Sequence, residues 1–195
     1  MKTDVIRVTN DENKTELAIE EAEKVAAYKK LSHKSALHLR LLAEEAMNMM
    51  RSIASDAEGF FWIEDNDGVF ELHLKVTTSV DEKQRKLLLS ASKSGKNEAA
   101  RGIMGKIRSF FEPVDGMPAF FDVSMFDSPN WEYSDMMWSM RRYQEQVKTY
   151  MQENRAGAAE AWDELEKSVV SNLADDVKVG ILGRDVEMII YKKLA

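Results

Sequence analysis

The sequence predicts an α+β domain in which a mixed, mostly antiparallel sheet carries helices on one face and receives a helical insertion. Residues 69–76 alternate apolar and polar side chains with a period of two, as in a strand with one buried face. Residues 34–55 instead place apolar side chains on one helical side, and residues 177–191 form two short apolar runs around a turn. The 195 residues are 44% hydrophobic and 31% charged, which suits one domain with an elaboration.

The first third of the chain predicts a strand followed by two helices. Residues 5–8 alternate weakly, and Asp11 and Asn13 can cap a helix that runs to about Lys30. The apolar positions of this helix are small, which favours close packing: Ala18, Ala22, Val25 and Ala26. The second helix has the strongest apolar stripe, formed by Leu39, Leu42, Ala43, Ala46, Met49, Met50 and Ile53. We expect Gly59 to end it.

A β-hairpin is expected next, because two apolar runs at 60–64 and 69–76 flank an Asp67-Gly68 turn signal. Phe70, Leu72, Leu74 and Val76 should then face inward. Further helices are expected at 81–89, at 97–111 (ending before Pro113), at 134–152 and at 158–173. Residues 113–130 form a predicted loop that holds all three prolines, and strands at 177–182 and 186–191 close the fold as a second hairpin.

Composition excludes several kinds of function. Without cysteine, the chain has no disulfide, thiolate nucleophile or zinc–thiolate site. No segment approaches the roughly 20 apolar residues of a membrane helix, and the net charge of −7 disfavours binding to phosphate backbones. We therefore expect a cytoplasmic protein without membrane or nucleic-acid partners. A basic cluster is either a local anion site or a solvated helix face: Lys93, Lys96, Arg101, Lys106 and Arg108.

A polar pair on the second predicted helix is the first candidate site. Glu44 and Asn48 are four residues apart, so they lie on one helix side about one turn from each other. Side-chain oxygens are hard ligands of the kind that suits Mg²⁺. Such a spacing is also common among ordinary solvated residues, which is the competing interpretation.

The order of elements and the run Leu42-Ala43-Glu44-Glu45-Ala46-Met47-Asn48 resemble the GHKL ATP-binding proteins, which include gyrase-type ATPases, histidine kinases and anti-sigma-factor serine kinases. The resemblance divides the chain into a sandwich, residues 1–114 and 175–195, and an insertion, residues 115–174. It implies ATP and Mg²⁺ as cofactors, with Asn48 as metal ligand and Glu44 as catalytic base. A weakened site with a regulatory role, as an ATPase or serine kinase if active, is the leading hypothesis.

Several family residues are replaced in this chain. The family grips adenine with a D-x-G-x-G motif, for which only Asp81 offers a carboxylate, and no glycines follow it. Gly95 and Lys96 precede a predicted helix N-terminus, where backbone N–H groups favour phosphate. Gly102 and Gly105 loosely resemble the family's second glycine turn. If they lie inside the helix, they mark close helix–sheet packing instead.

The remaining candidates concern histidines and the insertion. His33, His38 and His73 are too few and scattered to predict a metal site, so structural or solvated roles are expected. The insertion gathers aromatic and methionine side chains, among them Phe126, Trp131, Met137, Trp138 and Met140. They form either a satellite core or a contact surface within residues 113–151 for a regulatory protein or a second copy. The alternative function is therefore a non-catalytic interaction module on a degenerate GHKL-like scaffold.

Overall fold

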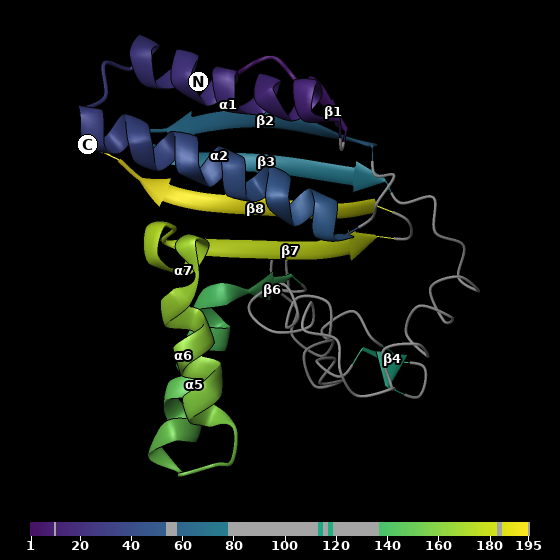
Figure 1. Cartoon of the computed structure of the whole chain (residues 1–195), viewed down its shortest axis with the longest axis vertical. Helices are drawn as coiled ribbons and strands as arrows, with labels where there is room; N and C mark the ends of the chain where they lie inside the picture. The colour runs from purple at the N-terminus through teal and green to yellow at the C-terminus, as the bar shows by residue number, and fades with distance from the viewer. Residues whose placement is uncertain are drawn as a thin grey trace, which may run out of the picture.

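A single six-stranded sheet organises the described part of the chain (Figure 1). The computed structural model describes residues 1–9, 11–53, 58–77, 113–114, 117–118, 137–182 and 185–194. The elements are β1 (Ile6–Thr9), α1 (Glu12–Tyr28), α2 (His33–Ile53), β2 (Glu58–Asn66), β3 (Val69–Thr77), β4 (Pro113–Val114), β5 (Met117–Pro118), β6 (Trp138–Ser139), α5 (Met140–Gln152), α6 (Ala158–Lys167), α7 (Val169–Leu173), β7 (Asp176–Leu182) and β8 (Asp185–Lys193). The strand order is β1-β2-β3-β8-β7-β6.

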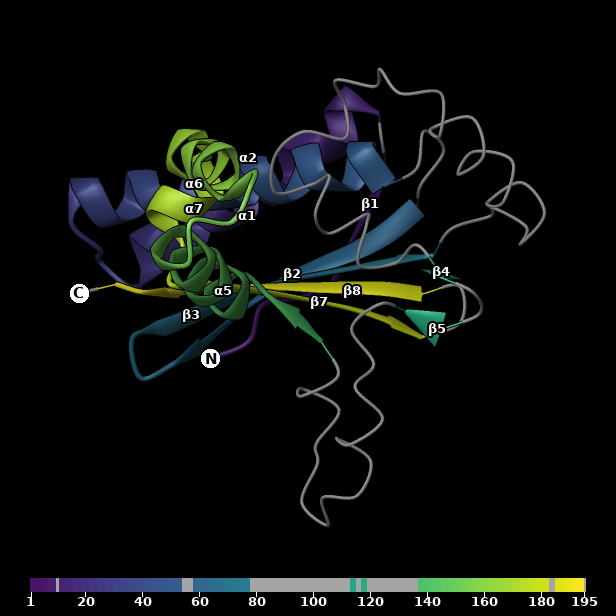
Figure 2. The same cartoon turned by 90° about the horizontal axis from the view of Figure 1, so that it is seen from below.

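The sheet is antiparallel at every described strand pair. β8 lies between β3 and β7, so the C-terminal hairpin is inserted beside a strand that precedes it by about 100 residues. Helices α1 and α2 cover one face, and the sheet seen edge-on separates them from the opposite face (Figure 2). The α+β class with helices on one face is confirmed, and the expected hairpins occur at β2–β3 and β7–β8.

The core fills the space between the sheet and the two helices. Alternate residues of the strands point into it and are at most 6% exposed: Phe61, Ile63, Phe70, Leu72, Leu74, Val76, Val177, Val179, Val186, Met188 and Ile190. The two helices bury their predicted apolar sides against these strand residues. In α1 the buried residues are the four small ones from Ala18 to Ala26, and in α2 they are the predicted stripe from Leu39 to Met50 together with Met47. Each large apolar side chain buried in this way contributes about 1.5–3 kcal/mol.

Gly59 is in a strand and does not end a helix, contrary to the sequence-based expectation. It lies in β2 opposite Val76. A Cβ atom there would lie 2.7 Å from the carbonyl oxygen of Lys75. The glycine therefore permits a close backbone approach within the sheet.

The start of the insertion also differs from expectation. The helix predicted from residue 134 begins at Met140, because Trp138 and Ser139 pair with β7 as the edge strand β6. Ser139 then caps α5, its side chain accepting a hydrogen bond from the Arg142 amide. Within the expected loop, β4 and β5 form a two-residue ladder. The helices predicted at 81–89 and 97–111 lie outside the described residues.

The β2–β3 turn is held by Asp65, a buried carboxylate. Its Oδ1 accepts a hydrogen bond from the Gly68 amide at 2.8 Å, and its other oxygen forms an ion pair with Lys29 at the end of α1. Burial raises the pKa of Asp65, but the bonds from Lys29 and Gly68 outweigh it and leave the pKa below its usual value. The Asp65 amide also donates to the Met1 carbonyl, and the Leu194 amide donates to the Gly68 carbonyl.

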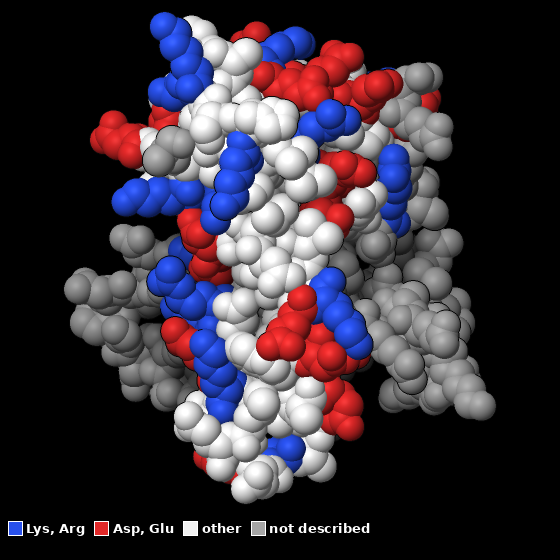
Figure 3. Space-filling view, turned by 60° about the vertical axis from the view of Figure 1, so that its left-hand side comes forward, with Lys and Arg blue, Asp and Glu red and all other residues white. Residues whose placement is uncertain are grey.

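Helices α5 and α6 form an arm that projects from the β6–β7 edge of the sheet (Figures 1 and 3). The two helices pack against each other, and their buried residues are Met140 and Val147 of α5 and Ala158 and Leu165 of α6. Three described members of the aromatic and methionine set, Met137, Trp138 and Met140, are buried. This burial is what the satellite-core interpretation expects. Among the described helices, none is long and apolar enough to cross a membrane.

Candidate functional site on the polar side of helix α2

The candidate site lies on the side of α2 that turns away from the buried stripe. Helical geometry places Glu44, Asn48 and Arg51 on that side, one turn apart along the axis. Glu44 and Arg51 are exposed, whereas Asn48 is half-buried. The predicted pair therefore occupies one helix side, with the amide deeper than the carboxylate.

A chain of hydrogen bonds fixes the Asn48 amide. The Arg51 guanidinium donates through Nη1 to Asn48 Oδ1 at 3.3 Å and through Nη2 to Thr15 Oγ1 at 3.2 Å. Thr15 is buried in the first turns of α1, and its hydroxyl donates to the Asp11 carbonyl at 3.1 Å. The end of α2 is thus tied to the beginning of α1, which restricts the orientation of the Asn48 oxygen.

Glu45, which the motif spacing did not select, is the carboxylate bonded to Asn48. Its side chain is half-buried. Burial raises the pKa of Glu45; the hydrogen bond with Asn48 opposes the rise and the nearby Glu44 charge adds to it, so the pKa stays above its usual value. A carboxylate with a raised pKa accepts a proton more readily, which is the property required of a general base.

The end of the sheet nearest to Asn48 can be defined from strand pairing. β2 begins at Glu58, five residues after α2 ends at Ile53, and Glu58 pairs with both Thr9 and Thr77. The start of α1, the end of α2 and the end of β3 consequently meet at one end of the sheet, here called the Thr77 end. Figure 1 shows α2 and β3 ending on the same side of the molecule.

The other predicted site residues belong to the segment that follows Thr77. Asp81, Gly95, Lys96, Gly102 and Gly105 lie outside the described residues. The described structure brings Glu44, Glu45 and Asn48 together beside Arg51. Whether the glycine positions lie near these four residues is outside what the described residues show.

The donor set on α2 fits Mg²⁺ bound together with a phosphate ligand. Asn48 Oδ1 and the two carboxylates are hard oxygen donors, and Mg²⁺ commonly takes one or two protein ligands plus phosphate oxygens and water. Among the described residues, no group of three or more His, Cys, Asp or Glu side chains could hold a metal by itself. A cation held by protein alone is therefore not favoured here, whereas one shared with a phosphate is chemically consistent.

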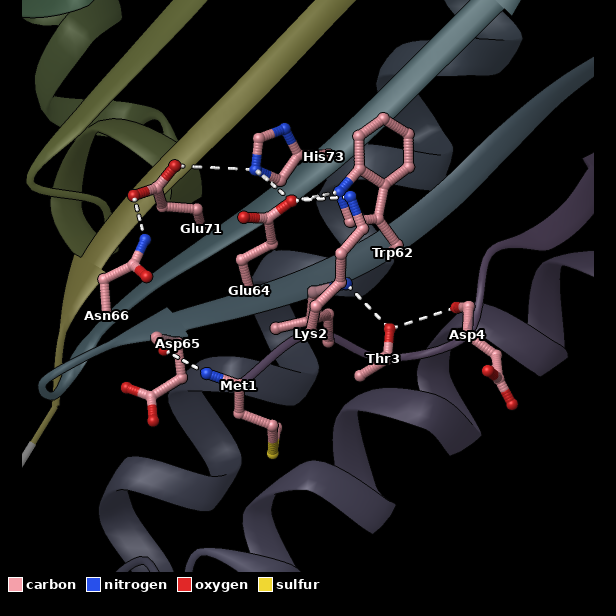
Figure 4. Close-up of polar contacts among 11 residues, drawn as sticks. Met1, Lys2, Thr3, Asp4, Trp62, Glu64, Asp65, Asn66, Glu71 and His73 are labelled. Carbon is pink, nitrogen blue, oxygen red and sulfur yellow. Dashed lines mark hydrogen bonds and ion pairs between the residues drawn. The ribbon is translucent and has the colours of Figure 1, made fainter.

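His73 lies on the opposite face of the sheet, where it packs among side chains of β2 and β3 (Figure 4). Its ring stacks on Trp62 with the ring centres 4.7 Å apart, and its Nε2 lies 3.5 Å from Glu71 and 3.9 Å from Glu64. Lys2 completes the cluster, 2.9 Å from Glu64 and 5.0 Å from the Trp62 ring centre. Both ring nitrogens are buried, and neither has a hydrogen-bond partner among the described residues.

The protonation of His73 follows from this burial. Burial lowers the pKa of His73, and the charges of Glu64, Glu71 and Glu187 oppose the shift without cancelling it. The side chain is therefore neutral near pH 7, because the negative charges of its carboxylate neighbours are too weak to keep it protonated. The structural role expected for this histidine agrees with its stacked, buried position.

Fold and site together define an α+β protein with a helix-covered antiparallel sheet and a magnesium-compatible polar patch on the covering helix. A comparison with protein-family models finds no match for the chain, and a comparison with curated proteins finds no relative. Its function therefore has to be argued from its own residues.

Proposed function

We propose that this chain binds Mg-ATP on the polar side of α2 and acts as a regulatory protein of the GHKL type with a modified site. The observation that carries the proposal is the half-buried, oriented Asn48 with two adjoining carboxylates and the Arg51 guanidinium. The patch lies at the Thr77 end of the sheet, where the chain enters the segment that contains the remaining candidates.

Each residue of the patch has a distinct role in this proposal. Asn48 Oδ1 holds Mg²⁺, and Arg51, which now donates to that oxygen, turns toward the phosphate charge. Glu45 accepts a proton from a nucleophilic hydroxyl or water, since its raised pKa suits this task better than a fully solvated carboxylate. Glu44 occupies the position that the family motif assigns to the base, and its exposure leaves it available to solvent and substrate.

Thermal unfolding with and without Mg-ATP tests the proposal. At 100 times its dissociation constant a ligand adds about 2.7 kcal/mol to the free energy of unfolding. For a chain of this size that stabilisation raises the midpoint by about 5–10 °C. Asn48→Ala should abolish the shift. Gln146→Ala, which removes another helical amide on the distant arm, should retain it.

Two results would contradict the proposal. The absence of any shift at millimolar Mg-ATP would leave no nucleotide function, and an undiminished shift in Asn48→Ala would remove the assigned site. If ATP is also hydrolysed, Glu45→Gln should slow phosphate release more than Glu44→Gln does, whereas the motif spacing alone predicts the reverse.

A non-catalytic interaction module is the second candidate function. The observation that favours it is the projecting α5–α6 arm, whose two helices bury only Met140, Val147, Ala158 and Leu165. Unchanged melting in Mg-ATP would select this alternative.

A further inference from the structure

The two helices of the arm carry opposite charge. α5 contains three basic residues and one acidic residue, a net charge of +2. α6 contains four acidic residues and one basic residue, a net charge of −3. In the lower half of Figure 3, blue Lys and Arg side chains are the more numerous on the left flank and red Asp and Glu side chains on the right, where blue ones also lie, with uncharged side chains between the flanks.

Each helix of the arm exposes charged side chains. In α5, Arg141 and Lys148 are seven residues apart, which puts them on the same side, and both are exposed. In α6, Glu160 and Asp163 are three residues apart and exposed on the side opposite the buried Leu165. The seam between α5 and α6 therefore leaves these four charges facing solvent.

The uncharged surface between the flanks is partly aromatic. Trp162 of α6 is half-buried, its Nε1 donating to Glu166 at 2.8 Å. Lys148 of α5 lies 5.4 Å from the centre of the Trp162 ring. Tyr150 is also half-buried near the tip of the arm, where Arg155 stacks over it. Aromatic and methylene surface of this kind can be covered by another helix pair.

We propose that the arm is a homodimerisation element, in which α5 of one copy packs beside α6 of the second copy and the reverse contact forms by symmetry. A two-fold arrangement produces both contacts from one surface, so a hairpin with one basic and one acidic helix complements itself. Four helices then alternate in charge around a bundle. Opposite charges across the contact favour this pairing and penalise one between like helices.

Sedimentation velocity with charge-reversed variants tests the proposal. The wild-type chain of 22.3 kDa should sediment as a dimer of about 45 kDa. The basic-helix variant Arg141→Glu/Lys148→Glu and the acidic-helix variant Glu160→Lys/Asp163→Lys should each be monomeric, because their homodimers would bring like charges together. An equimolar mixture of the two variants should again form dimers, since each unlike contact is restored between copies.

The mixture shows whether a variant loses dimerisation because the contact between copies is lost or because its own arm is destabilised. A substitution that only loosened the α5–α6 seam would not be rescued by a second variant. The proposal is overturned if the wild-type protein stays monomeric up to about 100 μM, if both variants dimerise as well as wild type, or if the mixture stays monomeric. Circular dichroism establishes that each variant is helical before it is mixed.

Wild-type protein provides a measurement that does not depend on the folding of any variant. Raising the salt from about 0.05 to 0.5 M should weaken the dimer roughly tenfold, because screening acts on exposed charges. A dimer that tightens or is unchanged in high salt would show that another surface joins the copies.

Discussion

Phe60 and Phe61 are neighbours on β2, but they lie on opposite faces of the sheet and in different surroundings. Phe61 points toward α1 and α2 and is fully buried, whereas Phe60 is 47% exposed on the opposite face. Asp65 is likewise buried whereas Glu64 is half-buried, and Leu72 and His73 lie on opposite faces although both are buried. The inner face is a continuous apolar layer with one bonded carboxylate at its end, whereas the outer face consists of aromatic, charged and amphipathic side chains.

The difference shows where the stability of this protein resides. Inner residues are held by many apolar contacts, so their loss leaves cavities that the structure fills poorly. Outer residues interact in cross-strand pairs, each worth about 0.2–1 kcal/mol. Substitutions at adjacent positions should consequently differ by several-fold in effect.

The largest effect is expected from the phenylalanine pair. Phe61→Ala should lower the free energy of unfolding by about 3–5 kcal/mol, because it creates a cavity in the core. Phe60→Ala should lower it by less than about 1 kcal/mol. Urea titration of both variants measures the difference. Equal losses would show that the outer face is covered by other parts of the protein and that the comparison of faces is wrong.

A smaller effect is expected from the neighbouring carboxylates. Asp65→Ala should cost about 2 kcal/mol at neutral pH, because the Gly68 amide and Lys29 lose a charged partner. Glu64→Ala should cost less than about 1 kcal/mol, since Glu64 is paired on the partly solvated face. Urea unfolding at pH 7 compares the two.

The pH dependence provides a check on Asp65. Its folded-state pKa lies below the ordinary value of 3.8, so its contribution is fully present above pH 3.8 and is lost as the pH falls through the folded-state pKa. The stability difference between wild type and Asp65→Ala should therefore be constant from neutral pH down to about pH 5 and shrink in stronger acid. A difference that disappears already near pH 6 would assign the stabilisation to another group.

The smallest effect concerns His73. His73→Phe preserves the stack on Trp62 and removes two unpartnered nitrogens, so stability at pH 8 should change by less than about 1 kcal/mol. Because the folded-state pKa is depressed, the contribution of neutral His73 is present above pH 6.5 and is lost as the pH falls through the folded-state pKa. The variant should not show this loss between pH 6.5 and 5. Parallel pH profiles for both proteins would contradict the assignment.

Elements with a clear internal period could be predicted from the sequence. Alternation in 69–76 identified the four inward residues of β3, and the stripe in α2 identified its buried side, because each pattern repeats over several turns or pleats. Gly59 was misinterpreted because glycine commonly ends helices, and its actual reason is a backbone contact with Lys75 across the sheet. Trp138 and Ser139 form a strand too short to show a period of two.

The candidate site could be predicted only in part. Glu44 and Asn48 share a helix side because their spacing is local, and that much follows from helix geometry. The link from Arg51 to Thr15 joins residues 36 positions apart, and the partial burial of Glu45 depends on its packed surroundings. Neither can be read from a motif, since both depend on how α1 and α2 pack.

The position of β8 has a consequence for how this protein is made. β3 pairs on one side with β2, to which a tight turn at Asp67 and Gly68 joins it directly, but 108 positions separate Thr77 from its partner Asp185 on the other side. During synthesis the apolar β3 must therefore persist with an open edge until the final hairpin leaves the ribosome. Closing such a distant pair is slow, and the exposed edge can meanwhile join other nascent chains. Chaperone occupancy of the nascent chain should be greatest in this interval.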